Sequence, residues 1–299
     1  MNAITMKHLR YFDALAHQGH FGRAAEACAI SQPALSQQVK ELEEIIGAPL
    51  VERATRHIRL TSLGEAFAER ARRILQAVDE LGDLARASSA RLAGPLQIGI
   101  IPTVAPYLLP SVIKSMTHGY PEVDLRPREA ITQKLVEELT EGRLDAAIVA
   151  LPVSEASLTE YPFFDEEFVL VRAQEDSGKP VPSADELRGM RLLLLEEGHC
   201  FRDQALSFCN MSSTPPRDLL EGSSLATLVQ MVGAGIGVTL IPEMAVQIET
   251  RSAPVSVARL TYPRPTRTIG MVWRKTNPLA DQFIDIAETI RKACLIEGK

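Results

Sequence analysis

Apolar residues recur every three or four positions from Leu9 to Ala16, which predicts a helix that Gly19 ends. An alanine-rich stretch over 21–29 predicts a second short helix. A third is expected from Ser31 to Gly47, because Ser is a good N-cap and the next residue but one is a proline, which the first turn tolerates. Three short helices with a tight turn before the last predict a helix-turn-helix.

The segment after this motif changes its pattern twice. Residues 49–61 mix β-compatible side chains with arginines, which predicts a small basic wing. From residue 62 the apolar positions follow a strict 4-3 repeat, typical of a helix that pairs with a second copy. The repeat consists of Phe67, Ala71, Ile74, Val78, Leu81 and Ala85. We expect 62–91 to be a linker helix with a dimer seam formed by Phe67, Ile74, Val78 and Leu81.

Beyond residue 92, short β-rich runs alternate with helical patterns. Strands are predicted at 96–101, 123–126, 145–150, 167–171, 190–195, 238–241 and 268–273. This alternation implies parallel sheets with crossovers. We therefore expect an all-α winged helix-turn-helix domain over 1–61 and an effector domain over 92–299. Its two α/β lobes would span about 92–165 with 267–299 (lobe I) and about 166–266 (lobe II).

Charge restricts the partners of the chain. Its 38 acidic and 32 basic residues give a net charge of −6, which argues against binding DNA or membranes through bulk positive charge. Residues 1–90 are neutral, so a local DNA contact is possible there. Four cysteines are too few for a disulfide scaffold, and the first residues lack the apolar block of a secretion signal. The long uncharged runs 92–113 and 222–242 are broken by prolines and glycines, so we expect a cytoplasmic protein without membrane contact.

The third predicted helix carries a face that suits DNA. Its polar residues lie opposite Leu35, Val39 and Leu42, and such a face can enter the major groove. Glutamine amides can bond adenine edges there, while Ser, Lys and the helix N-terminus can reach bases and phosphates. The pattern alone is equally typical of an ordinary solvated helix.

Specific motifs resolve this ambiguity. Four stretches of residues 21–64 resemble the LysR-type transcriptional regulators. They are Phe21-Gly22-Arg23-Ala24-Ala25-Glu26-Ala27, then Ser31-Gln32-Pro33-Ala34-Leu35-Ser36, then Leu42-Glu43, and the series Gly47, Leu50, Arg53, Thr61 and Gly64. The resemblance spans the whole chain. It implies a winged helix-turn-helix, a linker helix and a two-lobed effector domain like a periplasmic binding protein. It also implies a homodimer that assembles to a homotetramer on promoter or operator DNA.

The resemblance also assigns DNA contacts. Recognition-helix positions of the family match Gln32, Pro33, Ser36, Gln37 and Lys40, and basic wing positions match Arg53 and Arg56. Val51 and Gln37 depart from the residues usual in the family, a Phe and often an Arg. The first departure alters packing and the second can alter base preference.

The glycine-rich segment 233–237 invites a dinucleotide-binding interpretation. A strand is predicted after these glycines, however, whereas the phosphate-binding fingerprint needs a strand before them and a helix after them. The run 233–242 instead looks like the family's segment in the second lobe. We expect no cofactor and no metal.

The four cysteines differ in their surroundings. Cys28 and Cys294 are expected to be unreactive, as most free cysteines are. Cys200 lies at the predicted start of a helix, beside His199 and near Arg202, where helix amides and positive charge favour the thiolate. Cys209 follows nine positions later, about 13 Å along a continuous helix. A disulfide needs Cα atoms within about 7 Å, so joining the two would require the helix to unwind.

A closer resemblance concerns this thiol segment. The block 198–209 is similar to the redox segment of the peroxide-sensing members of the family. It implies that Cys200 reacts with hydrogen peroxide and that Cys209 resolves the sulfenic acid as a disulfide. Three positions, Thr103, Thr132 and Arg267, look similar to the pocket that orients peroxide, and His199 can help to move its proton. Phe201 departs from the usual Leu.

We therefore expect a peroxide-sensing transcriptional regulator that is not an enzyme. Its expected partners are double-stranded DNA, hydrogen peroxide, RNA polymerase and a cellular thiol reductant that resets the switch. The alternative is a LysR-type regulator that binds a small metabolite between its lobes, with Cys200 and Cys209 incidental. A thiol peroxidase is disfavoured by the DNA-binding module and by the lack of a Cys-x-x-Cys pair.

Overall fold

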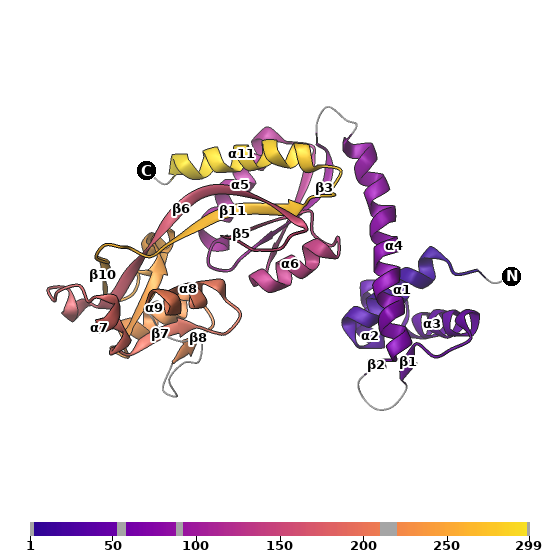
Figure 1. Cartoon of the computed structure of the whole chain (residues 1–299), viewed down its shortest axis with the longest axis horizontal. Helices are drawn as coiled ribbons and strands as arrows, with labels where there is room; N and C mark the ends of the chain where they lie inside the picture. The colour runs from indigo at the N-terminus through magenta and orange to yellow at the C-terminus, as the bar shows by residue number, and fades with distance from the viewer. Residues whose placement is uncertain (1–2, 53–57, 88–91, 210–219, 298–299) are drawn as a thin grey trace. The chain divides into compact units, whose positions relative to one another are not determined.

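The computed structural model describes residues 3–52, 58–87, 92–209 and 220–297 of the chain (Figure 1). These residues form two compact units, Met1–Ala85 and Arg86–Lys299. Figure 1 shows helices gathered around α4 in the first unit and a long twisted sheet with helices packed on it in the second.

The first unit contains the predicted helix-turn-helix. Its elements are α1 (Met6–Gln18), α2 (Phe21–Ala27), α3 (Gln32–Ile46), β1 (Val51–Glu52), β2 (Arg59–Leu60) and most of α4 (Ser62–Ala87). The helix ends predicted at Gly19 and Gly47 are confirmed. Both glycines adopt a left-handed conformation, with φ of +58° and +77°, which side chains disfavour. Ser31 caps α3 by accepting a hydrogen bond from the Ala34 N–H at 3.4 Å.

The wing makes the expectation of an all-α domain wrong. Strands β1 and β2 pair antiparallel, with Val51 opposite Leu60. Val51 is buried in the core of the unit and Leu60 packs against it, so these apolar side chains hold the ribbon on the helices. The predicted contacts Arg53 and Arg56 lie between the two strands, outside the described residues.

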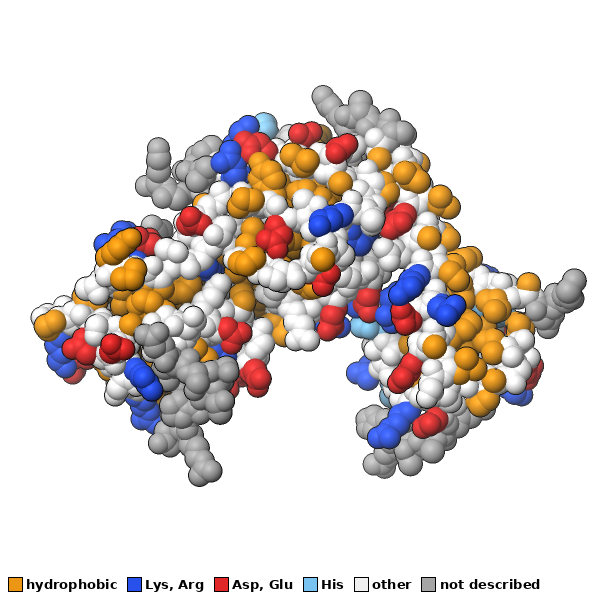
Figure 2. Space-filling view, in the orientation of Figure 1, with side chains coloured by type: hydrophobic (Ala, Val, Ile, Leu, Met, Phe, Trp, Pro, Cys, Tyr) orange, Lys and Arg blue, Asp and Glu red, His pale blue; other side chains and the backbone are white. Residues whose placement is uncertain are grey.

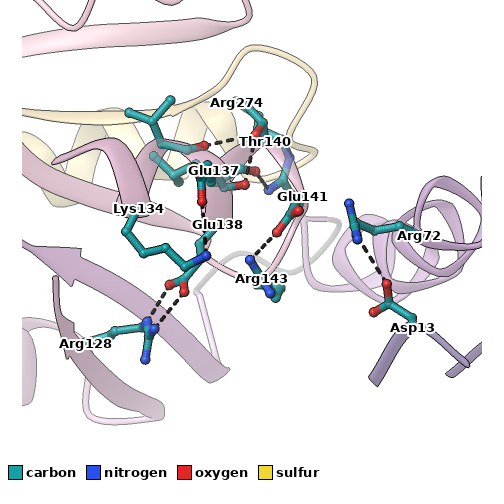
Figure 3. A network of polar contacts seen from close by, with 12 residues as sticks. Asp13, Arg72, Arg128, Lys134, Glu137, Glu138, Thr140, Glu141, Arg143 and Arg274 are labelled. Atoms are coloured by element: carbon teal, nitrogen blue, oxygen red, sulfur yellow. Dashed lines mark hydrogen bonds and ion pairs between the residues drawn. The ribbon is translucent and has the colours of Figure 1, made fainter. Parts of the chain in front are cut away.

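The core of the first unit includes one residue expected elsewhere. The ring of Phe67 packs edge-on against Phe12, with centroids 5.4 Å apart, so it contributes to this core, whereas the sequence predicted it for a dimer seam. An ion pair between Arg72 Nε and Asp13 at 3.2 Å also ties α4 to α1 (Figure 3). The first three turns of α4 are therefore part of the first unit.

The second unit is a mixed α/β structure. Its strands are β3 (Gly94–Ile100), β4 (Val123–Glu129), β5 (Ala146–Leu151), β6 (Leu158–Ala173), β7 (Leu192–Leu195), β8 (Glu221–Gly222), β9 (Val238–Pro242), β10 (Val255–Arg259) and β11 (Thr266–Arg274). Its α-helices are α5 (Ala105–Gly119), α6 (Thr132–Thr140), α7 (Ala184–Arg188), α8 (Cys200–Phe208), α9 (Leu225–Gly233), α10 (Val246–Glu249) and α11 (Ala280–Glu297). All seven predicted strands are present, and β8 and β10 were not predicted.

The expectation of purely parallel sheets is wrong. Within the described residues the strand order is β4-β3-β5-β11-β6-β9-β7-β8, with β10 also paired to β6. Strand β3 runs parallel to β4 and β5, and β7 runs parallel to β8 and β9. Strand β11, however, is antiparallel to both β5 and β6. The chain leaves on the long β6 and returns beside it on β11, and strands that run out and back must be antiparallel.

Two hydrophobic clusters lie along this sheet. The first cluster draws on residues 92–163 and 269–290, and the second on residues 168–260. We call the parts around them the first and second lobes. Strands β6 and β11 connect the two, so residues where these strands cross between the clusters can contact both lobes.

No helix in the described parts of the chain is both long and apolar enough to span a bilayer. In the same residues, no group of three or more His, Cys, Asp or Glu side chains is arranged to hold a metal ion.

Candidate DNA-contact and redox sites

Helix α3 presents the polar face that the sequence predicts. Its buried side is formed by Leu35, Val39 and Leu42. The proposed contact residues are all exposed: Gln32, Pro33, Ser36, Gln37 and Lys40. Because the proline is in the first turn and the polar residues share one face, the helix can be laid against a flat or grooved partner without losing its core contacts.

The second half of α4 exposes an apolar stripe. Ile74 is 49% exposed, Val78 38%, Leu81 64% and Leu84 55%. Figure 2 shows hydrophobic side chains at the surface along this part of the helix. In a monomer these side chains would be exposed to water. A second apolar helix packed against the stripe would cover them.

Helix α8 places the two cysteines at its opposite ends. Cys200 is its first residue, after the N-cap His199, and Cys209 is its C-cap. Both cysteines are free. Nine residues of helix separate them by about 13 Å along the axis, so the conformation described is the reduced one and cannot hold a disulfide between them.

The two thiols also contact different cores. Cys200 is partly exposed and packs against the first cluster, whereas Cys209 is fully buried in the second. Burial raises the pKa of the Cys209 thiol to about 11, because a thiolate there would lose its hydration. Cys209 is therefore a protonated, inaccessible thiol while α8 is folded.

A buried network connects Thr103 to Arg267. The Arg267 guanidinium donates to the Thr103 hydroxyl through Nη1 at 2.8 Å and to the Thr103 carbonyl through Nη2 at 3.1 Å. Its Nε donates to Glu166 Oε2 at 2.8 Å. The other oxygen of Glu166 accepts from the Met244 N–H at 2.9 Å. Burial raises the pKa of Glu166, while Arg267 and this N–H oppose the shift.

Helix α8 contacts this network through an aromatic ring. The guanidinium carbon of Arg267 lies 5.4 Å from the centroid of the Phe201 ring, within cation–π range. Phe201 also packs against Phe168, with centroids 4.7 Å apart. Arg267 therefore joins Thr103 of the first lobe to the residue next to Cys200.

His199 and Thr103 line one pocket. It has a volume of about 200 Å³, and its wall includes Tyr107, Glu129, Ser224 and Glu249. Burial lowers the pKa of His199, with Glu196 opposing the shift, which favours the neutral imidazole, the form that can accept a proton. The Tyr107 hydroxyl donates to Glu249 at 2.6 Å, which bridges α5 and α10 beside the same pocket.

Thr132 starts α6, and its hydroxyl is buried without a hydrogen-bond partner among the described residues. Gly198, just before α8, lies close to this segment. It has φ of +98°, and a Cβ there would lie 3.0 Å from Ile131 Cδ1. Ile131 and Gly198, which precede Thr132 and His199, are therefore neighbours. The Thr132 hydroxyl could form a hydrogen bond with a small molecule bound beside it.

A set of polar contacts holds α6 in place (Figure 3). Arg128 forms a two-pronged ion pair with the buried Glu138, with Nη2 2.7 Å from Oε1. Arg274 donates to the carbonyls of Leu139 at 2.6 Å and Leu144 at 3.1 Å. These contacts anchor the helix to β4 and β11, which fixes the position of Thr132 at its start.

One sequence argument is not supported. Arg202 was expected to add positive charge near Cys200, but its guanidinium is buried and donates to the Leu195 carbonyl at 2.8 Å and to Glu221 at 2.6 Å. Its charge is paired in the second lobe. Glu166 and Tyr107 were missed, because Glu166 is the middle one of three consecutive acidic residues, 165–167, and no local pattern sets it apart.

Comparisons with known proteins agree with this architecture. The model of the bacterial regulatory helix-turn-helix protein, lysR family, matches residues 6–65, and that of the LysR substrate binding domain matches residues 89–293. The chain belongs to the LysR family of bacterial regulators.

Individual relatives align with almost the full length of the chain. It is 39% identical over 291 residues to the DNA-binding transcriptional dual regulator OxyR of Escherichia coli K12, covering 96% of this chain and 95% of that protein. A full-length OxyR variant from Pseudomonas aeruginosa superposes with a TM-score of 0.74 at 38% identity, covering 97% of this chain and 96% of that one. An H₂O₂-bound OxyR mutant from Corynebacterium glutamicum gives a TM-score of 0.66 at 34% identity, covering 98% and 94%.

Proposed function

We propose that the protein is a hydrogen-peroxide-sensing, DNA-binding transcription regulator and not an enzyme. Its switch is a reversible disulfide between Cys200 and Cys209. The observation that carries this proposal is helix α8, which begins with a partly exposed cysteine beside the His199 pocket and ends with a buried one. The full-length similarity to peroxide-responsive regulators supports it.

The chemistry has two steps. The Cys200 thiolate attacks one oxygen of H₂O₂, so that an S–O bond forms, the O–O bond breaks and hydroxide leaves and takes up a proton. Cys209 then attacks the sulfenic sulfur, which forms the S–S bond and releases a second hydroxide, protonated to water. Two thiols and one H₂O₂ thus give a disulfide and two waters. Thr103, Thr132, His199 and Arg267 would orient the peroxide, and a cellular thiol reductant would reverse the reaction.

The second step changes the fold. Because the two sulfurs lie at opposite ends of α8, the disulfide can form only when the helix unwinds and Cys209 leaves the second cluster. The effector unit therefore has two conformations, and oxidation selects one of them. The two lobes, arranged like those of a periplasmic binding protein, would transmit this change to the subunit arrangement.

The DNA contacts follow from α3 and the wing. Gln32, Pro33, Ser36, Gln37 and Lys40 would face the major groove of an operator, and Arg53 and Arg56 would contact the backbone. The stripe Ile74, Val78 and Leu81 would pair two subunits, and dimers would assemble to a tetramer that engages RNA polymerase in the cytoplasm. The domain limits would be 1–61, 62–91 and 92–299.

The pocket keeps one alternative open for test. Its volume of about 200 Å³ and its polar wall suit a small metabolite, as in a regulator without a redox switch. Intact mass and peptide mapping after one equivalent of H₂O₂ distinguish the two. We expect the loss of two hydrogens and a linked pair of peptides containing Cys200 and Cys209.

Two variants sharpen this experiment. Cys200→Ser should form no intramolecular disulfide, and Cys209→Ser should stop at the sulfenic or an over-oxidised acid on Cys200. The matched control is Cys28→Ser, which should oxidise like the wild type. If Cys200→Ser still forms the disulfide, or if the wild type consumes no thiol while a metabolite alone shifts its DNA footprint, the metabolite alternative replaces the proposal.

A further inference from the structure

The guanidinium of Arg267 is held in place by Glu166. Its guanidinium is fully buried, and Nε and Nη2 both lie 2.8 Å from the same oxygen of Glu166. The two residues face each other across β11 and β6, where Arg267 pairs with Glu166 in the strand register. The Met244 N–H fixes the second carboxylate oxygen. Glu166 therefore holds Arg267 in one orientation.

This orientation determines what the Thr103 hydroxyl can do. A guanidinium only donates hydrogen bonds, so Thr103 Oγ1 accepts from Arg267 Nη1 at 2.8 Å. The hydrogen of the Thr103 hydroxyl must then point elsewhere. Thr103 lines the pocket that His199 also lines, so this hydrogen is available to a molecule bound there. The network makes Thr103 a donor toward the pocket.

We propose that Glu166 is a positioning residue for peroxide reduction: it orients Arg267, and Arg267 in turn fixes Thr103 as a hydrogen-bond donor to the departing oxygen. The inference rests on the proposed function. As the Cys200 sulfur bonds to one peroxide oxygen and the O–O bond breaks, negative charge develops on the other oxygen, which leaves as hydroxide and is then protonated. A preoriented hydroxyl stabilises that charge without reorganisation.

A purely structural ion pair is the competing explanation, and it makes different predictions. It would alter the folding of the unit or every reaction of Cys200 alike. Positioning through Thr103 affects only a reaction whose leaving group needs a donor. Iodoacetamide alkylates the same thiol but releases iodide, which needs no proton, so it serves as the reference reaction.

The test uses the reduced full-length protein and follows Cys200 modification with time. Glu166→Gln keeps the side-chain shape and removes the carboxylate; we expect peroxide oxidation to slow roughly tenfold, while alkylation does not slow. The matched control is Glu167→Gln. Glu167 is the next residue on β6, but it pairs with Arg264 at 3.1 Å and has no role in the network, so both rates should stay within about twofold of wild type.

A double variant tests the route through Thr103. Thr103→Val removes the hydroxyl, and adding Glu166→Gln to it should slow peroxide oxidation no further. If Glu166→Gln does not fold, as circular dichroism would show, Glu166→Asp keeps the charge but shortens its reach and should show the same selective slowing. The proposal is overturned if the folded variant oxidises at the wild-type rate, if alkylation slows in parallel, or if the two substitutions act independently. A wild type inert to peroxide would instead refute the proposed function.

Discussion

The cysteines at the two ends of helix α8 have identical side chains but opposite surroundings. Cys209 is fully buried with its pKa near 11, whereas Cys200 is partly exposed at the rim of the first cluster. In the proposed reaction Cys209 resolves the sulfenic acid, and a thiol that is protonated and buried cannot compete with Cys200 for peroxide. It becomes reactive only after α8 opens, so the order of the two steps is built into the helix.

This contrast predicts the pattern of alkylation. At pH 8 a thiol of pKa about 11 is about 100-fold less ionised than one of ordinary pKa near 9, so Cys209 should react with iodoacetamide at least 100-fold more slowly than an exposed cysteine. Because the pKa is raised in the folded protein, the stabilisation from a neutral Cys209 is present below about pH 9 and is lost as pH rises toward 11. Mass-spectrometric labelling at pH 8 measures the first effect, and denaturant unfolding from pH 8 to 11 measures the second. Equal labelling of Cys200 and Cys209 at pH 8 would contradict the burial of Cys209.

DNA recognition offers a second test on single side chains. Ser36→Ala should reduce discrimination between cognate and altered operators by about 1–3 kcal/mol, because Ser36 is on the exposed face of α3. Arg59→Ala, on the exposed side of the wing strand β2, should instead weaken all sequences alike and lower the salt slope by about one. Binding titrations at several salt concentrations separate the two. Identical effects of both substitutions on cognate and random DNA would refute this division.

The sequence named candidate site residues but not the contacts between them. Cys200, Cys209, His199, Thr103 and Arg267 came from motif resemblance, and the hydrogen bond between Thr103 and Arg267 joins positions 164 residues apart. The error over Arg202 has the same origin, because its partner Glu221 lies nineteen residues downstream. Partners distant in sequence leave no local pattern.

At the scale of elements, helix signals were the most informative. Ser31 and the glycines at 19 and 47 act locally, so their caps could be predicted within a residue. Strand existence was also predictable from apolar runs. Strand direction was not, because β11 pairs with β5 and β6 through contacts that depend on where the returning chain meets the sheet.

The start of α4 permits a direct test of close packing. A Cβ on Gly64 would lie 2.1 Å from the Leu50 carbonyl oxygen, whereas one on Gly82 in the same helix would meet nothing within 4 Å. Gly64→Ala should therefore destabilise the first unit by about 1–3 kcal/mol. Gly82→Ala should stabilise α4 by about 0.5–1 kcal/mol, because alanine favours a helix interior. Thermal unfolding of the two variants checks the sign of each change, and a Gly64→Ala protein as stable as wild type would show that the contact relaxes.

At the scale of the whole molecule, charge is divided between the units. The acidic excess of the chain falls after residue 90, which leaves the helix-turn-helix neutral and able to approach DNA. A single α3 would contact one major groove, and two copies are needed to read two half-sites. The exposed stripe on α4 is a surface that could pair them.

If two subunits pair through α4, one charge placed in its apolar stripe should weaken the dimer. Ile74→Glu would place a carboxylate within the stripe of Ile74, Val78, Leu81 and Leu84, where a partner helix would bury it, so we expect the dimer to weaken at least tenfold. Gln76→Glu adds the same charge on the opposite side of α4, where Gln76 contacts Glu80, and should leave the dimer intact. Sedimentation over a range of concentrations measures association, and operator titrations measure its consequence. Ile74→Glu should lose operator affinity while keeping the contacts of α3, because binding two half-sites depends on the linked pair. A dimer that persists at low concentration would show that another surface joins the subunits.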